Sequence, residues 1–159
     1  MSRQKYLLVT AMFACAFLTL APAGHAVQAA DDRLQIEQTA RDYIEGWYTA
    51  DPVRMARALH PDLIKRYVET LPDGQQVVKS VNRDQMVELT RTGGGSKTPA
   101  DRGKISIQIL DISGEIAAVK TISPEYVDLL SLAKIQDHWV ILNVLWRFVT
   151  PSGSAATKK

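Results

Sequence analysis

Four β-prone runs near the end of the chain, between Lys104 and Phe148, limit its possible folds more than any other feature. From 105 to 109 isoleucines alternate with polar residues, which is the period of a strand with one buried face. Ser113-Gly114 supplies a turn before the second run, 116–122. Further runs at 126–135 and 139–148 are joined by only three polar residues. Successive strands with short connections predict an antiparallel meander.

The last two runs are apolar on both of their faces. In the final strand, one predicted face carries Trp139, Ile141, Asn143 and Leu145, and the other carries Val140, Leu142, Val144, Trp146 and Phe148. An antiparallel sheet usually leaves one face in water, so two dry faces need two covers. We expect helices to cover one face and a second copy of the chain to cover the other.

A helix is predicted over residues 32–49. Asp31 or Asp32 can cap its start, and Gln35 completes a pattern similar to a capping box. Its apolar positions follow helical spacing: Ile36, Ala40, Tyr43, Ile44 and Trp47. Such spacing places all five side chains on one face, which must therefore be buried.

Two shorter helices follow this one. Asp51-Pro52 starts the second, because aspartate caps free N–H groups and proline fits the first helical position. We predict that it ends at His60, since Pro61 disfavours helical geometry in the residue before it. Asn82 and Gln85 repeat the capping pattern for a third helix, which Gly93-Gly94-Gly95 ends.

Turn-forming residues separate the second helix from the third. Leu71-Pro72-Asp73-Gly74 lies between β-prone runs at 63–70 and 75–79, which predicts a hairpin. We expect 93–103 to form a flexible loop. Its glycines do not make it a phosphate-binding loop, because no Gly-Lys-Ser/Thr follows and the loop comes after a helix.

Both ends of the chain lie outside the predicted domain, which spans 31–149. The first 29 residues have basic residues, then an apolar run of 16, then small residues, the layout of a secretory signal peptide. We expect cleavage between Ala23 and Ala30. The run falls short of the roughly 20 residues that a membrane span needs. The tail, 150–159, is small, polar and basic, and we predict that it is disordered.

Charge and cysteine content exclude several classes of protein. All 17 acidic residues follow the leader, and two of the 19 basic residues lie within it, so the mature chain is balanced at 17 each. A nucleic-acid-binding domain needs a clustered basic face, and the sequence has no such cluster. The only cysteine, Cys15, lies in the leader, which excludes disulfides and thiolate catalysis from the mature domain. Scattered histidines offer no metal site, and we predict no cofactor.

The order of helices, hairpin and meander is similar to the cone-shaped nuclear-transport-factor-2-like fold, also called SnoaL-like or ketosteroid-isomerase-like. Within it, the chain resembles the putative lumazine-binding family over about residues 33 to 148. The segments that carry this likeness are Asp42-Tyr43-Ile44, Gly46-Trp47-Tyr48, Leu59-His60-Pro61-Asp62-Leu63, Lys65-Arg66, Ile116-Ala117-Ala118-Val119-Lys120, Tyr126-Val127-Asp128 and 139–146. The chain departs from the family at Leu129, where tyrosine is frequent, and at 136–138, where a glycine turn is usual.

The resemblance implies an α+β domain with three helices packed on a curved, mainly antiparallel sheet. It also implies a homodimer formed through the sheets and a pocket between the helices and the concave sheet. Relatives on this scaffold include isomerases, cyclases, dehydratases and non-catalytic binders, so fold alone does not select the chemistry.

Three polar residues are candidates for chemistry. Asp128 shares a predicted strand face with apolar residues, where a desolvated carboxyl would act as a general acid or base; the alternative is that it pairs with Lys134, an arginine or backbone donors. His60 is either a proton shuttle or a hydrogen-bonded hinge beside a proline. Arg66 either holds an anionic ligand or positions a nearby carboxylate such as Asp62 or Asp128.

The remaining candidates are aromatic residues and one asparagine. Aromatic side chains here serve either as core and interface or as walls for a flat ligand. Asn143 needs a polar partner, either a ligand or a neighbouring backbone group. The predicted ligand-binding residues are Tyr43, Trp47, His60, Arg66, Tyr126, Asp128, Asn143 and Trp146.

We therefore predict a periplasmic or secreted homodimer that binds a small organic molecule without catalysing a reaction. One alternative is an isomerase, cyclase or dehydratase in which Asp128 or His60 moves a proton. Another is a structural or partner-binding module whose pocket is filled by its own side chains.

Overall fold

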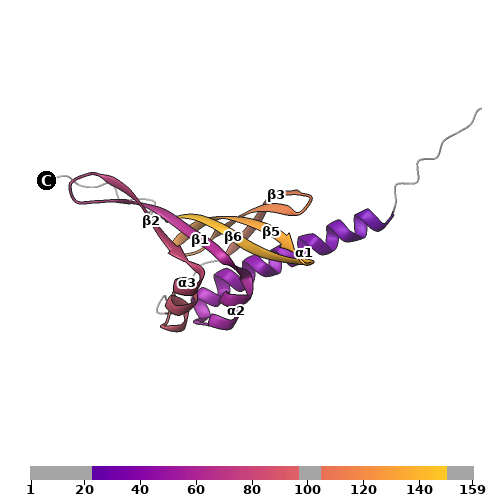
Figure 1. Cartoon of the computed structure of the whole chain (residues 1–159), viewed down its shortest axis with the longest axis horizontal. Helices are drawn as coiled ribbons and strands as arrows, with labels where there is room; N and C mark the ends of the chain where they lie inside the picture. The colour runs from indigo at the N-terminus through magenta and orange to yellow at the C-terminus, as the bar shows by residue number, and fades with distance from the viewer. Residues whose placement is uncertain (1–22, 97–104, 150–159) are drawn as a thin grey trace, which may run out of the picture.

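A computed structural model describes residues 23–96 and 105–149 of the chain. The predicted tail and most of the predicted leader and glycine loop lie outside these residues. The elements are α1 (Ala23–Thr49), α2 (Pro52–Ala58), β1 (Leu59–Thr70), β2 (Gln76–Asn82), α3 (Arg83–Arg91), β3 (Ser106–Ser113), β4 (Ile116–Ile122), β5 (Tyr126–Ile135) and β6 (His138–Phe148). Three helices packed on one curved sheet confirm the predicted fold class (Figure 1).

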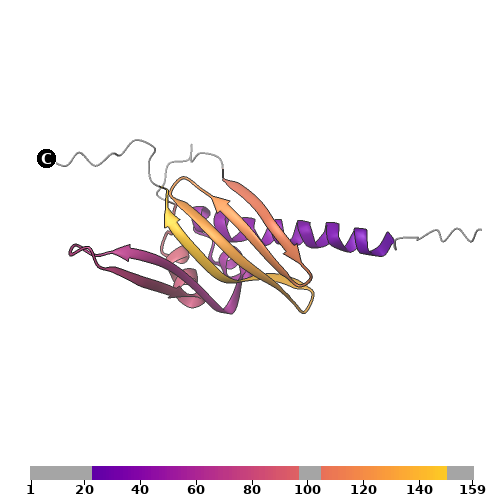
Figure 2. The same cartoon turned by 90° about the horizontal axis from the view of Figure 1, so that it is seen from above.

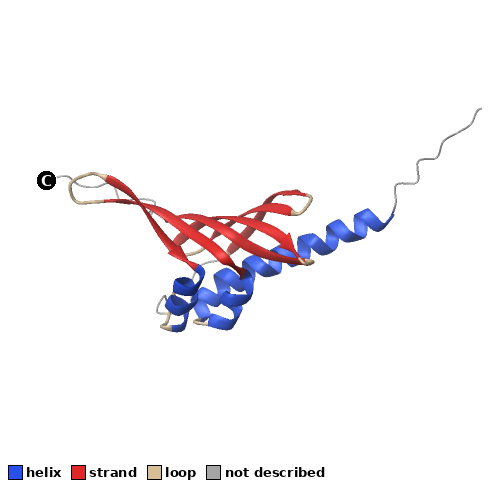
Figure 3. Ribbon diagram, viewed as in Figure 1, coloured by secondary structure: helices blue, strands red, loops and turns tan. Residues whose placement is uncertain are grey.

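The six strands form a single sheet in the order β2-β1-β6-β5-β4-β3. All neighbours are antiparallel except β1 and β6, which run parallel. The last four strands are the predicted meander, and the β1–β2 hairpin extends beyond them as an arm (Figure 2). All three helices lie on one side of the sheet (Figure 3).

Local sequence signals explain where the helices begin. The Asp51 carboxylate accepts the N–H groups of Val53 and Arg54, both at 3.0 Å, and Pro52 occupies the first turn of α2. Asn82 and Gln85 form the predicted capping box at α3, with both reciprocal bonds at 2.9 Å.

Two helix boundaries differ from the prediction. The first helix begins at Ala23, not at 32, so it includes part of the segment assigned to the leader, and its first turns extend past the sheet (Figure 1). The second helix ends at Ala58, not at His60, because Leu59 already pairs with Ile141 of β6. Strand pairing therefore ends this helix two residues earlier than the predicted effect of Pro61. As a result, β1 begins at Leu59 instead of 63.

The predicted faces of β6 are wrong for its second half, because a bulge interrupts its pairing with β5. Ile141 lies opposite Leu132 and Asn143 lies opposite Ser131, so Leu142 is an extra residue. One extra residue exchanges the two faces of every residue after it. Trp139, Ile141, Val144 and Trp146 consequently face the helices, whereas Asn143 and Leu145 are exposed on the outer face.

Glycine permits a close approach between the loop after α3 and the end of α1. The N–H of Gly95 donates to the carbonyl oxygen of Trp47 at 3.1 Å. A Cβ atom at Gly95 would lie 2.6 Å from Nε1 of Trp47 and 2.8 Å from the ring of Tyr48. The loop therefore packs against these rings only because residue 95 has no side chain.

Candidate functional site

A cavity of about 250 Å³ lies between the helices and the inner face of the sheet. We call it the Lys65 cavity. Its walls are formed by Tyr43, Ile44, Trp47, Lys65, Tyr67, Val81, Met86, Leu89, Tyr126, Asp128 and Trp146. Apolar and aromatic side chains dominate this surface, and Lys65 and Asp128 are its two charged residues.

Aromatic rings form most of the wall around Trp146. Its ring centroid lies 4.6 Å from that of Tyr67 and 5.3 Å from that of Tyr126, with the Tyr126 ring nearly perpendicular to it. Trp47 from α1 meets Tyr126 edge to face at 6.3 Å. Rings held by such contacts keep a fixed orientation, and their faces suit a flat ligand.

A buried cluster of four side chains forms the polar floor of the cavity. Oδ1 of Asp128 accepts the hydroxyl of Tyr43 and the ammonium of Lys65, both at 2.9 Å. Its Oδ2 accepts the hydroxyl of Thr121 at 3.4 Å. Asp128 is 1% exposed and the Lys65 side chain 11%, so this is a buried ion pair.

Four different elements bring this cluster together. Asp128 lies in β5, where it is paired with Thr121 of β4 and Trp146 of β6. Lys65 comes from β1, two strands away, and Tyr43 comes from α1 above the sheet. The cluster exists only once the sheet has formed and α1 has packed on it.

The ammonium of Lys65 is also surrounded by aromatic rings. Its Nζ lies 5.2 Å from the ring centroid of Tyr43, 5.7 Å from that of Tyr126 and 5.0 Å from that of Trp146. It donates one hydrogen bond to Asp128 and one to the Tyr43 hydroxyl, at 2.5 Å. An ammonium has three donors, so one N–H has no acceptor among the described residues.

Burial shifts the pKa of three groups in the cavity. It lowers the pKa of Lys65, and the attraction of Asp128 offsets only part of this effect. It raises the pKa of Tyr43 well above its ordinary value, and the negative charge of Asp128 adds to the shift. Burial, with a smaller effect of Glu125, raises the pKa of Tyr126 to about 12. Both tyrosines are therefore neutral hydrogen-bond donors at neutral pH.

The cavity opens between α3 and the hairpin arm. Val81 and Leu89 line both the cavity and an adjoining outer hollow, where Asp84, Gln85 and Glu88 also lie. The capping box holds α3 directly after β2, which places these polar side chains at the rim. A ligand entering here passes a polar rim before it reaches apolar walls.

Five of the eight predicted ligand-binding residues line this cavity: Tyr43, Trp47, Tyr126, Asp128 and Trp146. His60 lies elsewhere in β1, and its Nδ1 accepts the N–H of Asp62 at 3.1 Å, as in the predicted hinge. Arg66 and Asn143 lie on the outer face, where a 3.4 Å hydrogen bond joins them.

Lys65 and Tyr67 are cavity residues that we did not predict. Lys65 is the partner of Asp128, whereas Lys134, which we considered for this role, pairs with Asp32 at 2.9 Å. A signal was present in the sequence: Leu63, Lys65 and Tyr67 alternate along one strand, which places the lysine on the face of a buried leucine.

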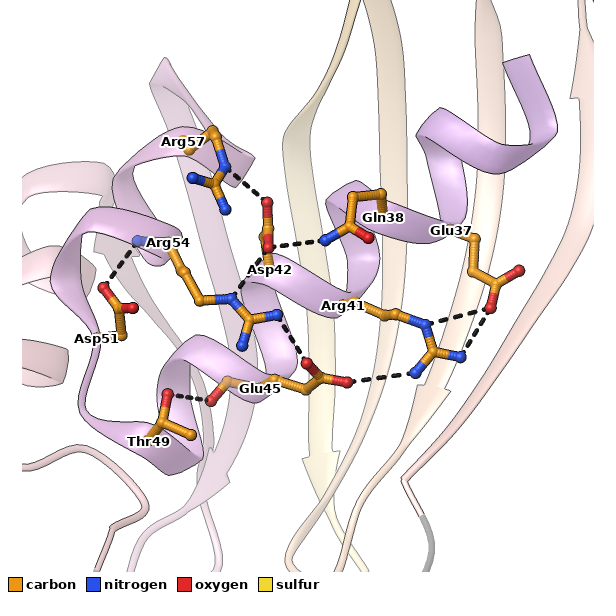
Figure 4. A network of polar contacts seen from close by, with 9 residues as sticks. All are labelled: Glu37, Gln38, Arg41, Asp42, Glu45, Thr49, Asp51, Arg54 and Arg57. Atoms are coloured by element: carbon orange, nitrogen blue, oxygen red, sulfur yellow. Dashed lines mark hydrogen bonds and ion pairs between the residues drawn. The ribbon is translucent and has the colours of Figure 1, made fainter. Parts of the chain in front are cut away.

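A second polar network lies outside the cavity and fastens α1 to α2 (Figure 4). Asp42 accepts Arg57 at 2.7 Å and both Arg54 and Gln38 at 3.0 Å. Burial raises the pKa of Asp42, but these hydrogen bonds outweigh it, so the pKa lies below its ordinary value. Because every strong partner in this network is a protein side chain, we assign it to the stability of the helix pair.

Among residues 23–96 and 105–149, no three histidine, cysteine, aspartate or glutamate side chains gather closely enough to hold a metal ion. No helix in that part of the chain is both long and apolar enough to cross a membrane.

The profile of a protein family described as "Putative lumazine-binding" matches residues 31–147. Among solved structures, an NTF2-like protein of unknown function from Shewanella baltica is similar, with 16% identity, a TM-score of 0.57, and coverage of 76% of this chain and 96% of that one. An NTF2-like protein with a cystatin-like fold from Novosphingobium aromaticivorans is also similar. It has 12% identity and a TM-score of 0.57, and the match covers 88% of this chain and 95% of that one.

A structure described as a putative scytalone dehydratase, also from Novosphingobium aromaticivorans, has 14% identity and a TM-score of 0.51, and the match covers 79% of this chain and 89% of that one. At such low identities these likenesses show the fold alone. A comparison with curated protein sequences finds no match.

Proposed function

Because the chain belongs to the family described as "Putative lumazine-binding", within the nuclear-transport-factor-2-like fold, we propose that it binds one small, flat organic molecule in the Lys65 cavity and releases it unchanged. The observation that carries this proposal is the cavity itself, with aromatic walls and one buried ion pair at its floor. This combination fixes both the plane of a ligand and the position of its polar atoms.

The volume of the cavity supports a small ligand. Its 250 Å³ holds roughly eight water molecules at their volume in the liquid, about 30 Å³ each. Small-molecule sites usually measure about 300–1,000 Å³. The Lys65 cavity lies just below this range, so it suits a ligand of one ring or two fused rings. The same volume favours a binding protein over a module whose pocket is filled by its own side chains.

The charge at the floor favours a particular class of ligand. Lys65 already places a positive charge among the rings, so a cationic ligand would be repelled. A carbonyl oxygen or a deprotonated ring nitrogen could instead accept its free N–H. The indole N–H groups of Trp47 and Trp146 are buried without a partner among the described residues, but they have almost no surface that a ligand in this cavity could reach.

The test is a fluorescence titration with lumazine, a flat bicyclic molecule. Val81→Phe should weaken binding at least about tenfold, because the larger ring fills the entrance that Val81 lines. Val78→Phe is the matched control: it lies on the same strand, is 68% exposed and is absent from the cavity wall. Equal affinity of both variants, or no binding by the native chain, would contradict the proposal.

We also propose that the mature protein is exported to the periplasm or secreted, after removal of the leader. Native mass spectrometry of the protein purified from its own host tests this together with ligand binding. The expected species begins between residues 23 and 31 and carries a small bound compound. A species that keeps Met1 in the cytoplasmic fraction would contradict export.

A second copy of the chain is our proposed cover for the outer face of the sheet. Val68, Leu129 and Leu145 are between 45% and 56% exposed there, and Leu129 lies opposite Leu145. Leu145→Lys should convert a dimer to a monomer in sedimentation experiments. Leu34→Lys on α1 is the control, since Leu34 is 68% exposed on another surface. A native chain that is monomeric at high concentration would refute the dimer.

An acid–base enzyme is the second candidate, favoured by the 2.9 Å hydrogen bond between the Tyr43 hydroxyl and Asp128 at the cavity floor. In such an enzyme Asp128 would remove a proton next to a carbonyl group and Tyr43 would donate to the carbonyl oxygen. The assay is exchange of the α-hydrogens of cyclopentanone in D₂O, followed by NMR. Exchange that is lost in Asp128→Asn but kept in Lys65→Met would support this candidate over simple binding.

A further inference from the structure

The surroundings of Lys65 go beyond what simple binding requires. A lysine buried in an apolar cavity is unusual, because side chains of this type almost always keep the ammonium in water. Here the Nζ lies in the wall of a cavity, beside a carboxylate, a phenol and three ring faces. A hydrogen-bond donor alone could have been supplied by a neutral side chain.

We propose that Lys65 forms a reversible imine with the carbonyl group of an aromatic aldehyde or ketone held in the Lys65 cavity. This inference rests on the proposed function, because it assumes that the cavity admits a flat ligand, and it names the chemical class of that ligand. Buried lysines in apolar pockets are the type of lysine that forms Schiff bases.

The groups needed for the reaction are all within the floor cluster. The ammonium transfers one proton to Asp128, and the nitrogen lone pair then attacks the carbonyl carbon. A C–N bond forms while the C=O π electrons move to oxygen, which takes that proton back from Asp128. The hydroxyl group then leaves as water with a second proton from nitrogen, relayed by Asp128, and the nitrogen lone pair closes the C=N bond. The product is the iminium, because its nitrogen keeps the third proton of the original ammonium.

The overall reaction balances as ammonium plus carbonyl compound giving iminium plus water. One positive charge is present before and after it, so no unpaired charge is buried. Asp128 remains a carboxylate and serves as counter-ion in both states. The ring faces of Tyr43, Tyr126 and Trp146 lie close enough to stabilise either cation.

Other lysines in the chain provide a comparison. Burial lowers the pKa of Lys65, which increases the neutral, nucleophilic fraction, tenfold for each unit of pKa. The hydrogen bond to Asp32 raises the pKa of Lys134, which lies outside the cavity. Lys79 is half exposed and pairs with Glu69 on the surface. Lys65 should therefore react faster than either one, although it is the least accessible of the three.

The test uses the full chain, benzaldehyde as the probe and sodium cyanoborohydride to reduce any imine to a stable secondary amine. Intact mass and peptide mapping then count and locate the benzyl groups. At pH 7 we expect one benzyl group, on Lys65, introduced at least about tenfold faster than on Lys134 or Lys79. Lys65→Arg keeps the cation but has no nucleophilic amine at this pH, so it should lose this label, whereas Lys134→Arg should retain it.

Benzyl alcohol separates failure of this inference from failure of the proposed function, because it has the same ring without the carbonyl group. If benzyl alcohol quenches tryptophan fluorescence but benzaldehyde leaves Lys65 unlabelled, the imine is refuted and the binding site stands. If labels spread over lysines according to their exposure, the imine is also refuted. If neither probe enters the cavity, both proposals fail. Peptide mapping of the native chain decides among these outcomes even where a variant does not fold.

Discussion

A double-mutant cycle on Lys65 and Asp128 measures the ion pair at the cavity floor. Lys65→Met removes the ammonium and leaves Asp128, 1% exposed, with only the hydroxyl groups of Tyr43 and Thr121 as donors. Removing one partner of a buried pair costs about 3–5 kcal/mol. Asp128→Asn should cost about 3 kcal/mol of stability, at the lower end of this range. The amide oxygen still accepts the Tyr43 hydroxyl, and the remaining lysine can lose its proton.

The double variant should be less destabilised than the sum of the two single variants. It contains no buried charge, and the amide oxygen introduced by Asp128→Asn would still accept the Tyr43 hydroxyl. We expect a coupling energy of about 2–3 kcal/mol, measured by urea unfolding at pH 7 with tryptophan fluorescence. Lys134→Met is the control, since the Asp32–Lys134 pair lies outside the cavity and its loss should destabilise the fold less than the loss of the Lys65–Asp128 pair. If the stability lost in the double variant equals the sum of the losses in the two single variants, the two residues do not interact and the assigned ion pair is refuted.

The same cycle predicts a dependence on pH with a definite sign. In Asp128→Asn the buried lysine keeps a pKa below its ordinary value, since burial lowers it and the carboxylate no longer offsets this. The folded state then binds fewer protons than the unfolded state between this lowered pKa and roughly 10.4, so stability rises with pH in that window. The stability that Asp128→Asn loses relative to the native chain should therefore become smaller between pH 7 and about pH 9.5. A loss that grows over this range would contradict the reasoning.

Three further predictions concern the surroundings of the cavity. Gly95→Ala should cost about 1–3 kcal/mol in urea unfolding and weaken lumazine binding, because its Cβ would lie 2.6 Å from Trp47 Nε1. Asp42→Asn should reduce stability more at pH 7 than in acid, because the lowered pKa of Asp42 stabilises the fold above roughly pH 3.9 and this contribution is lost as pH falls through the folded value. Tyr126→Phe should reduce alkaline unfolding between pH 10 and about 12, where the native folded state retains a proton that the unfolded chain loses.

Much of the fold could be predicted because its signals are local. Alternation within each strand, two-residue turns and the capping box at Asn82 each act over a few residues. The turn predicted at Ser113-Gly114 shows this well, since Gly114 adopts a positive φ of 58°, as a tight hairpin turn between two strands requires. Such signals define elements and their order.

The site was only partly predictable, because its central contact joins residues far apart in the chain. Lys65 and Asp128 are separated by 63 positions, and their strands are not adjacent in the sheet. The sequence shows that each is polar on a strand with apolar neighbours, but not that they meet. Lys134 lies on the strand of Asp128 and was the nearer candidate, yet six positions along a strand put it about 20 Å away.

The bulge at Leu142 connects the error in the fold to the origin of the cavity. Strict alternation from Trp139 and Ile141 would place Leu145 on the inner face and Trp146 outside. The extra residue reverses this order, so that Trp146 lies opposite Asp128 with its ring 5.0 Å from Nζ of Lys65. The same extra residue places Asn143 on the outer face of the sheet. The irregularity that alternation cannot predict is therefore what encloses the lysine in aromatic rings, and the chemical character of the site depends on it.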